Sequence, residues 1–163
     1  DVEERYRKRY LDLVLNPEVK GAFEKRSDLI REMREFLWKE GFLEVEIPTL
    51  QAIYGGGAAK PFKTHINAWD MKMYLSISPE LFLKKCLVGG FEKVFTICKN
   101  FRNEDIDRTH NPEFTMIEWY QAYIDYNQLM KDTEKLISRV CKKVNGTTKV
   151  KYGDKELDFK TIS

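Results

Sequence analysis

The spacing of apolar residues predicts three helices. Between Asn16-Pro17 and Glu40, apolar residues recur every three or four positions, as on one face of a helix. Asn16 suits an N-cap, Pro17 suits the first helical position, and Gly41 is placed to end the helix. The two other predicted helices have similar boundaries: one runs from Ser78-Pro79 to Gly89-Gly90, and one follows a capping box of Asp125 and Gln128.

Segments with two-residue alternation lie between the helices. In "FLEVEIP", residues 42–48, Leu43, Val45 and Ile47 share one face and two glutamates share the other, which predicts a half-buried strand ended by Pro48. The other predicted strands are 72–78, 93–101, 114–123 and a hairpin over 150–159. The loop between 93–101 and 114–123 is too short for a parallel crossover, so we expect an antiparallel pair. The predicted class is α+β.

A glycine-rich segment, "YGGGAAKPF", covers residues 54–62. It has neither the GxGxxG spacing nor the GK[ST] ending of a phosphate-binding loop. Taken alone, it has two interpretations. One is a flexible connector, and the other is a backbone that must approach a ligand closely, which glycine permits.

Composition excludes several classes of protein. The 163 residues carry a formal net charge of +2, so charge alone does not require a nucleic-acid partner. We interpret the basic cluster at residues 5–9 as a solvated helix face rather than a binding patch. The three cysteines are widely spaced and lack metal-ligand spacing, which indicates a reducing, cytoplasmic location without a zinc site. The sequence shows no signal peptide and no apolar run long enough to span a membrane.

Charged and hydrogen-bonding side chains are most concentrated in "FRNEDIDRTHNPEFTMIEWY", residues 101–120. Strand alternation predicts that Arg102 and Glu104 point the same way. It also places four residues of the second strand on one face: Phe114, Met116, Glu118 and Tyr120. Charged side chains are costly in a core, so this face predicts either the floor of a ligand cleft or a salt-bridged surface hairpin.

These groups suit a nucleotide together with a cationic amine. Arg102 offers a planar fork for phosphate or carboxylate, and Phe114 can stack on a flat base. Glu104 can accept hydrogen bonds from an exocyclic amine. Glu118 with Tyr120 suits a cationic amine, and His110 in the loop could reach a polyphosphate. His65 is interpreted as structural.

The same stretch resembles motif 2 of the class II aminoacyl-tRNA synthetases, most closely the lysyl-tRNA synthetases. "RYLDLVLNPEV" resembles the start of that family's catalytic domain, and "FLEVEIPTL" resembles motif 1 with its proline at Pro48. The match continues from "GGGAAKPF" through "FRNE", and it covers nearly the whole chain. Motif 1 is expected at about 28–48 and motif 2 at about 94–123, in a catalytic fold whose antiparallel sheet is flanked by helices.

The resemblance implies that the chain acts in activating lysine with ATP and magnesium and in transferring lysine to tRNA(Lys). Arg102 is expected to hold the α-phosphate and the lysine carboxylate, and it is the expected catalytic residue. The implied ATP-binding residues are Arg102, Glu104, His110, Asn111, Phe114 and Met116. The implied lysine-binding residues are Gly56, Glu80, Arg102, Glu118 and Tyr120. The predicted partners are L-lysine, ATP, tRNA(Lys) and a second copy bound through the motif 1 region.

The sequence also departs from the family pattern. Lys60 stands where the family commonly has arginine, and Ile66 stands where it often has a second histidine. We find neither motif 3 nor an anticodon-binding domain, so the sequence is expected to be the N-terminal half of a catalytic domain. The magnesium ligands are expected beyond Ser163, with no metal site in this chain, and the chain alone is expected to have little activity.

Two alternatives stay open at this point. One is a lysyl-synthetase paralogue that lysylates elongation factor P, which "NPEFTMIEWY" also resembles. The other is a non-catalytic fragment that binds ATP, tRNA or a protein.

Overall fold

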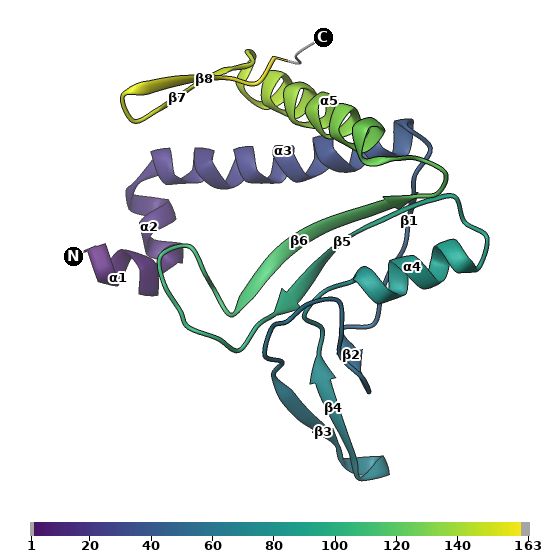
Figure 1. The fold of residues 1–163 in the computed structure, drawn as a ribbon. Coiled ribbons are helices and arrows are strands. Elements are labelled where there is room, and N and C mark those ends of the chain that lie inside the picture. Colours follow the sequence, from purple (N-terminus) through teal and green to yellow (C-terminus); the bar gives the residue numbers. More distant parts are fainter. Residues whose placement is uncertain (1, 161–163) are drawn as a thin grey trace. The chain divides into compact units, whose positions relative to one another are not determined.

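The computed structural model describes residues 2–160, which form helices and small sheets (Figure 1). The chain divides into two compact units. One unit combines the residues up to 36 with those from 125 onward, and the other comprises residues 37–124. This mixture of helices and sheets agrees with the predicted α+β class.

The first unit begins with three consecutive helices: α1 (Val2–Arg7), α2 (Arg9–Leu15) and α3 (Pro17–Lys39), whose last three residues belong to the second unit. The buried carboxylate of Asp12 accepts hydrogen bonds from Arg5 at 2.6 Å, from Arg9 and from Asn16 at 2.8 Å. Asn16 therefore stands where the N-cap was predicted, but its side chain binds Asp12. The other two cations of the basic cluster pair with Glu3 and Glu4, as a solvated helix face requires.

The first unit ends with α5 (Tyr126–Asn145) and a hairpin of β7 (Lys149–Tyr152) and β8 (Lys155–Asp158), so the predicted hairpin is confirmed. The Asp125 side chain accepts from the Gln128 amide at 3.0 Å, which confirms the predicted cap. The Gln128 side chain donates to Asp132 instead of turning back to the cap. Among the apolar residues of α5, Leu136, Val140 and Cys141 are buried, whereas Leu129, Met130 and Ile137 are exposed.

The second unit contains two sheets and a helix. One sheet has the order β1-β5-β6, with β1 (Leu43–Glu44), β5 (Lys93–Phe101) and β6 (Glu113–Gln121). The other has the order β2-β4-β3, with β2 (Leu50–Gln51), β4 (Met71–Leu75) and β3 (Lys63–Ile66), and a short 3-10 helix, η1 (Asn67–Trp69), joins β3 to β4. Helix α4 (Glu80–Val88) contacts both β5 and β6 (Figure 1).

The long β5–β6 pair is antiparallel, as the short connecting loop predicted. Its register sets Val94 opposite Tyr120 and Cys98 opposite Met116. The second strand ends two residues earlier than predicted, because Tyr123 adopts a left-handed backbone with φ of 62°. β1 adds to the other edge of β5 in parallel, so the sheet is mixed rather than wholly antiparallel.

The strand predicted over residues 42–48 is mostly absent. Only Leu43 and Glu44 pair with β5, and the Val45 amide adds one bond to the Phe95 carbonyl at 2.9 Å. Leu43 was placed on the buried face by the alternation, yet 45% of it is exposed. The alternation is real in the sequence, but the chain leaves β5 after three residues, and Pro48 has no amide with which to extend a ladder.

The core of the second unit includes residues of β4, α4 and β5. It contains Leu37, Phe42, Met73, Ile77, Leu83, Val94 and Phe95. A polar row is buried with it: Ser76, Ser78, Thr96 and Asn100. β4 ends at Leu75, three residues before the predicted end, and the backbone of Ser76 then bonds Thr49 and Phe101, at 2.8 Å each, ahead of α4.

Candidate functional site

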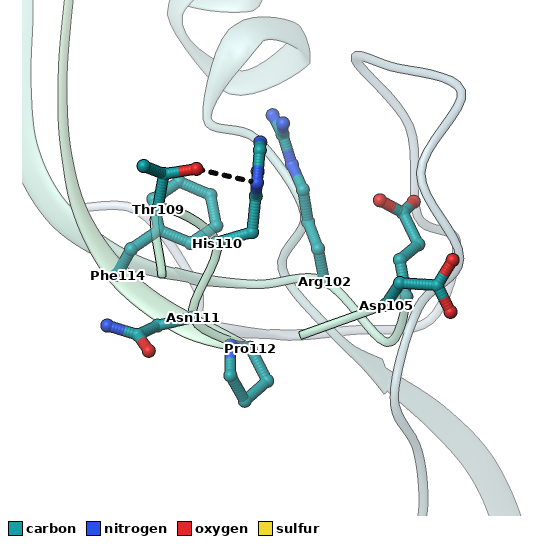
Figure 2. A pocket seen from close by; sticks show the side chains of 8 residues that line it. Arg102, Asp105, Thr109, His110, Asn111, Pro112 and Phe114 are labelled. Atoms are coloured by element: carbon teal, nitrogen blue, oxygen red, sulfur yellow. Dashed lines mark hydrogen bonds between the residues drawn. The ribbon is translucent and has the colours of Figure 1, made fainter. Parts of the chain in front are cut away.

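A cavity of about 220 Å³ is formed by the loop that joins β5 to β6 and by the start of β6 (Figure 2). Its lining residues are Arg102, Glu104, Asp105, Thr109, His110, Asn111, Pro112 and Phe114. Five of the six residues that the sequence assigned to ATP therefore line one cavity. Met116, the sixth, lies further along β6 opposite Cys98 and does not line it.

Arg102 is one of the residues that line this cavity. Its backbone amide donates to the Pro112 carbonyl at 2.9 Å, and its guanidinium lies over the Phe114 ring, 5.2 Å from the centroid. Its Nε donates weakly to the Ile77 carbonyl at 3.4 Å. Figure 2 shows the Arg102 side chain beside that of His110. The guanidinium is thus placed against an aromatic face, a geometry in which arginine can present its fork to an anion.

The prediction that strand alternation points Arg102 and Glu104 the same way was wrong. β5 ends at Phe101, so alternation does not apply to either residue. Glu104 is held instead by the glycine-rich segment. The Lys60 amide donates to Glu104 Oε1 at 2.8 Å, and the Lys60 carbonyl accepts from the Asn103 amide at 2.8 Å.

His110 is oriented by an aspartate in its own loop. Its Nδ1 lies 2.8 Å from Asp107 Oδ2, and both side chains are exposed. The backbone amide of Thr109 donates to Asp107 Oδ1 at 2.7 Å. This bond, followed by that from His110, holds the pKa of Asp107 well below its usual range. A charged Asp107 fixes Nδ1 as the proton-bearing nitrogen and leaves Nε2 for a ligand.

A second cluster lies further along β6. Glu118 Oε1 accepts from the Ser78 hydroxyl at 3.0 Å, and Glu118 Oε2 accepts from the Tyr120 hydroxyl at 3.3 Å. Burial, and next the charges of Glu118 and Glu80, raise the pKa of Tyr120 to about 12. Tyr120 therefore stays a neutral hydrogen-bond donor across the physiological range.

Gly56 and Glu80 complete the second cluster. Gly56 has φ of +88°, and a Cβ there would lie 2.8 Å from the Ser78 hydroxyl and 3.0 Å from Glu80 Cβ. The glycine-rich segment is therefore not a free connector, because at Gly56 it touches the start of α4 with no room for a side chain. Glu80 lies in the first turn of α4, as predicted, and pairs with Lys84 at 2.6 Å.

Sequence reasoning missed two participants in this arrangement. Ser78 was interpreted only as the start of α4, and Lys60 only as a departure from a family pattern. No local signal marks Ser78, which follows Ile77 and precedes Pro79, as a hydrogen-bond partner of Glu118. Nothing in the sequence indicates that the Lys60 backbone, rather than its side chain, binds Glu104.

The remaining candidates lie apart from these clusters. His65 lies on β3 and faces Asp70 at 3.2 Å. Within residues 2–160, no three His, Cys, Asp or Glu side chains are grouped to hold a metal ion. None of the described helices combines the length and the apolar character needed to cross a bilayer.

The chain was compared with known proteins. The family model for "tRNA synthetases class II (D, K and N)" matches residues 1–163. A lysine–tRNA ligase of Pelotomaculum thermopropionicum is 61% identical over 98% of this chain and 31% of its own length. Similar ligases come from Clostridium botulinum strain Langeland, at 59% over 32% of its length, and Methanoculleus marisnigri, at 57% over 31%. The chain spans about a third of the length of the curated relatives it matches.

Proposed function

This chain belongs to the class II tRNA synthetases (D, K and N), and we propose from that premise that it forms part of a site that activates lysine with ATP for transfer to tRNA(Lys). The similar proteins bear the name lysine–tRNA ligase. The observation that carries the choice of lysine is the pairing of Tyr120 with Glu118. A carboxylate held beside a neutral phenol suits an ammonium group, whereas a carboxylate side chain would be repelled and an uncharged amide would lack the charge attraction.

The cavity in the β5–β6 loop is proposed to receive ATP. Phe114 offers its ring to the adenine, and Glu104 uses one oxygen for Lys60 and keeps the other for the exocyclic amine. His110 and Asn111 also line the cavity, and they are proposed to contact the phosphates. Met116 is proposed to border the nucleotide from its neighbouring position on β6.

Arg102 is proposed as the catalytic residue. The lysine carboxylate attacks the α-phosphorus in line, and pyrophosphate leaves. Arg102 binds the carboxylate and the α-phosphate together, which positions the two reactants and stabilises the negative charge of the transition state. Its place over Phe114 fixes the guanidinium before the substrates arrive.

Lysine is proposed to lie between the glycine-rich segment and β6. The Gly56 backbone and the Glu80 carboxylate hold the α-amino group, and Glu118 with Tyr120 hold the ε-amino group. The contacts of Ser78 support this arrangement, because Gly56, Glu80 and Glu118 all meet this one serine, and Tyr120 is bonded to Glu118.

Magnesium accompanies ATP in this family and neutralises phosphate charge when bound. The described residues do not provide a grouped set of acidic ligands for magnesium, so no residue of this chain is assigned to bind it in the proposed reaction.

The test is lysine-dependent exchange of pyrophosphate into ATP by the complete gene product that contains these residues. We expect exchange with lysine and a strong preference over aspartate and asparagine. Equal rates with all three amino acids, or no exchange with lysine, would overturn the proposal. We expect the 163-residue chain by itself to have little activity, since it spans about a third of the length of its relatives. Offering the same protein tRNA(Lys) and elongation factor P identifies the acceptor, and we expect lysine to be transferred to tRNA(Lys).

We also propose that the region corresponding to motif 1 joins two copies of the protein. Its exposed apolar side chains support this assignment: Leu29 is 37% exposed, Trp38 53% and Leu43 45%. Light scattering that shows only monomer at micromolar concentration would contradict it.

A further inference from the structure

We propose that Ser78 is a positioning residue for amino-acid selection, which holds the Glu118 carboxylate ready for a cationic side-chain amine. The inference deepens the proposed function and rests on it. It adds a residue that is expected to touch neither lysine nor ATP.

The hydroxyl of Ser78 has its hydrogen-bond directions fixed by its neighbours. The side chain is buried, with 3% of the residue exposed. Its oxygen accepts from the backbone amide of Glu80 at 3.1 Å. An amide can only donate, so the single proton of the hydroxyl is left for Glu118 Oε1, 3.0 Å away. Ser78 therefore acts as a donor toward the carboxylate.

This donation, together with that of Tyr120, fixes the carboxylate of Glu118 from both ends. Tyr120 donates to Oε2 at 3.3 Å from its own strand, whereas Ser78 donates to Oε1 from the start of α4. A carboxylate has about four acceptor positions, so two remain for an incoming ammonium group. Without Ser78 the carboxylate keeps its charge but loses one of the two bonds that set its rotamer.

Ser78 itself cannot shift easily. A Cβ on Gly56 would lie 2.8 Å from its hydroxyl, so the glycine-rich segment closes the space on one side. On the other side Ser78 immediately precedes Pro79, whose ring restricts the serine backbone. Ser78 therefore holds the Glu118 side chain of β6 at a fixed position relative to the start of α4.

The test uses the complete gene product and compares Ser78→Ala with Ser76→Ala. Ser76 is fully buried two residues away, but its hydroxyl donates to Asn100 at 2.8 Å, with a longer contact of 3.3 Å to the Ser78 carbonyl, and does not bond Glu118. The control therefore removes a buried serine hydroxyl from the same segment without touching the carboxylate. Pyrophosphate exchange gives kcat and the KM values for lysine and ATP, and thermal unfolding gives the Tm of each variant.

We expect Ser78→Ala to raise the KM for lysine about ten-fold or more, as loss of a charged hydrogen bond does, with the KM for ATP changed less than about two-fold. Ser76→Ala should lower Tm comparably and leave the KM for lysine unchanged. Ser78→Cys has a side chain of similar size with a weak donor, so its KM for lysine should lie between those of wild type and Ser78→Ala. This variant replaces Ser78→Ala in the test if the alanine variant does not fold. In a Glu118→Gln background, Ser78→Ala should add little.

The inference is overturned if wild-type exchange depends on lysine but Ser78→Ala, or Ser78→Cys where the alanine variant does not fold, leaves the KM for lysine unchanged. It is also overturned if Ser76→Ala raises that KM equally. Absence of lysine-dependent exchange in the wild type refutes the proposed function instead, and the role of Ser78 with it.

Discussion

The backbone amide of Lys60 donates a hydrogen bond of 2.8 Å to Glu104 Oε1, across 44 residues of sequence. The bond joins the glycine-rich segment to the loop that forms the cavity proposed for ATP. The Asn103 amide also donates to the Lys60 carbonyl, so two hydrogen bonds join the two segments. Glu104 is therefore a structural anchor as well as a proposed adenine ligand, and the two roles can be separated.

Substitution of Glu104 separates them. Glu104→Gln keeps an oxygen that can accept from Lys60 but replaces the other acceptor with a donor, whereas Glu104→Ala removes both. We expect both variants to raise the KM for ATP by about ten-fold, because each loses the acceptor for the adenine amine. Only Glu104→Ala should speed hydrogen exchange at the Lys60 amide, measured by NMR. Protection of that amide in Glu104→Ala would show that the anchor lies elsewhere.

The contact at Gly56 predicts an unusually severe effect of one methyl group. Gly56→Ala forces a side chain into a left-handed backbone and to within 2.8 Å of the Ser78 hydroxyl. We expect a loss of about 2 kcal/mol in the free energy of unfolding from strain and overpacking, measured in urea. We also expect a higher KM for lysine.

Gly57→Ala is the matched control, since no atom lies within 4 Å of its added Cβ and its backbone is not left-handed. Its stability should stay within about 0.5 kcal/mol of wild type. An equal loss in both variants would mean that the whole segment, rather than the contact at Gly56, determines stability.

Local signals were sufficient to predict most elements of the fold. Helical spacing located α3, and the Asp125 cap located the start of α5, because these depend on residues within one or two turns. The failure over residues 42–48 has a tertiary cause. Alternation reports which side chains could share a face, but the number of residues that pair depends on where β5 lies, which no local pattern contains.

The candidate site was predictable only in part. Side-chain chemistry and spacing singled out most of the candidates between 101 and 120, and the family resemblance added Asn111, Gly56 and Glu80. The structure brings five of the six residues proposed for ATP to one cavity. The bonds of Ser78 and Lys60 were not predictable, since each depends on a partner 40 or 44 residues away. The close contact at Gly56 was not predictable either, because a glycine-rich sequence is equally compatible with a free loop.

The raised pKa of Tyr120 predicts a late phenol titration. Burial, then the charge of Glu118, raises this pKa to about 12, above the value of about 10 for the unfolded chain. The folded state therefore keeps its proton after the unfolded state has lost it. The contribution of Tyr120 to stability is complete below about pH 10 and is lost as the pH rises toward 12.

Absorbance at the tyrosinate band measures this step directly. Tyr120→Phe should remove the latest part of the transition, and Glu118→Gln should move that part to lower pH because the neighbouring negative charge is gone. A titration of Glu118→Gln that matches wild type would show that the carboxylate does not act on the phenol.

The position of Arg102 over Phe114 predicts that a positive charge alone does not replace it. Arg102→Lys keeps the charge but loses the planar fork and the stacking on the ring. We expect kcat for lysine-dependent pyrophosphate exchange to fall about 100-fold or more, with smaller changes in the KM for lysine or ATP, because the fork acts mainly on charge that develops in the transition state. Arg108→Lys is the control, since Arg108 belongs to the same loop but does not line the cavity. A loss in Arg102→Lys that appears only in KM would make Arg102 a binding residue for the ground state and would move the catalytic role to another group.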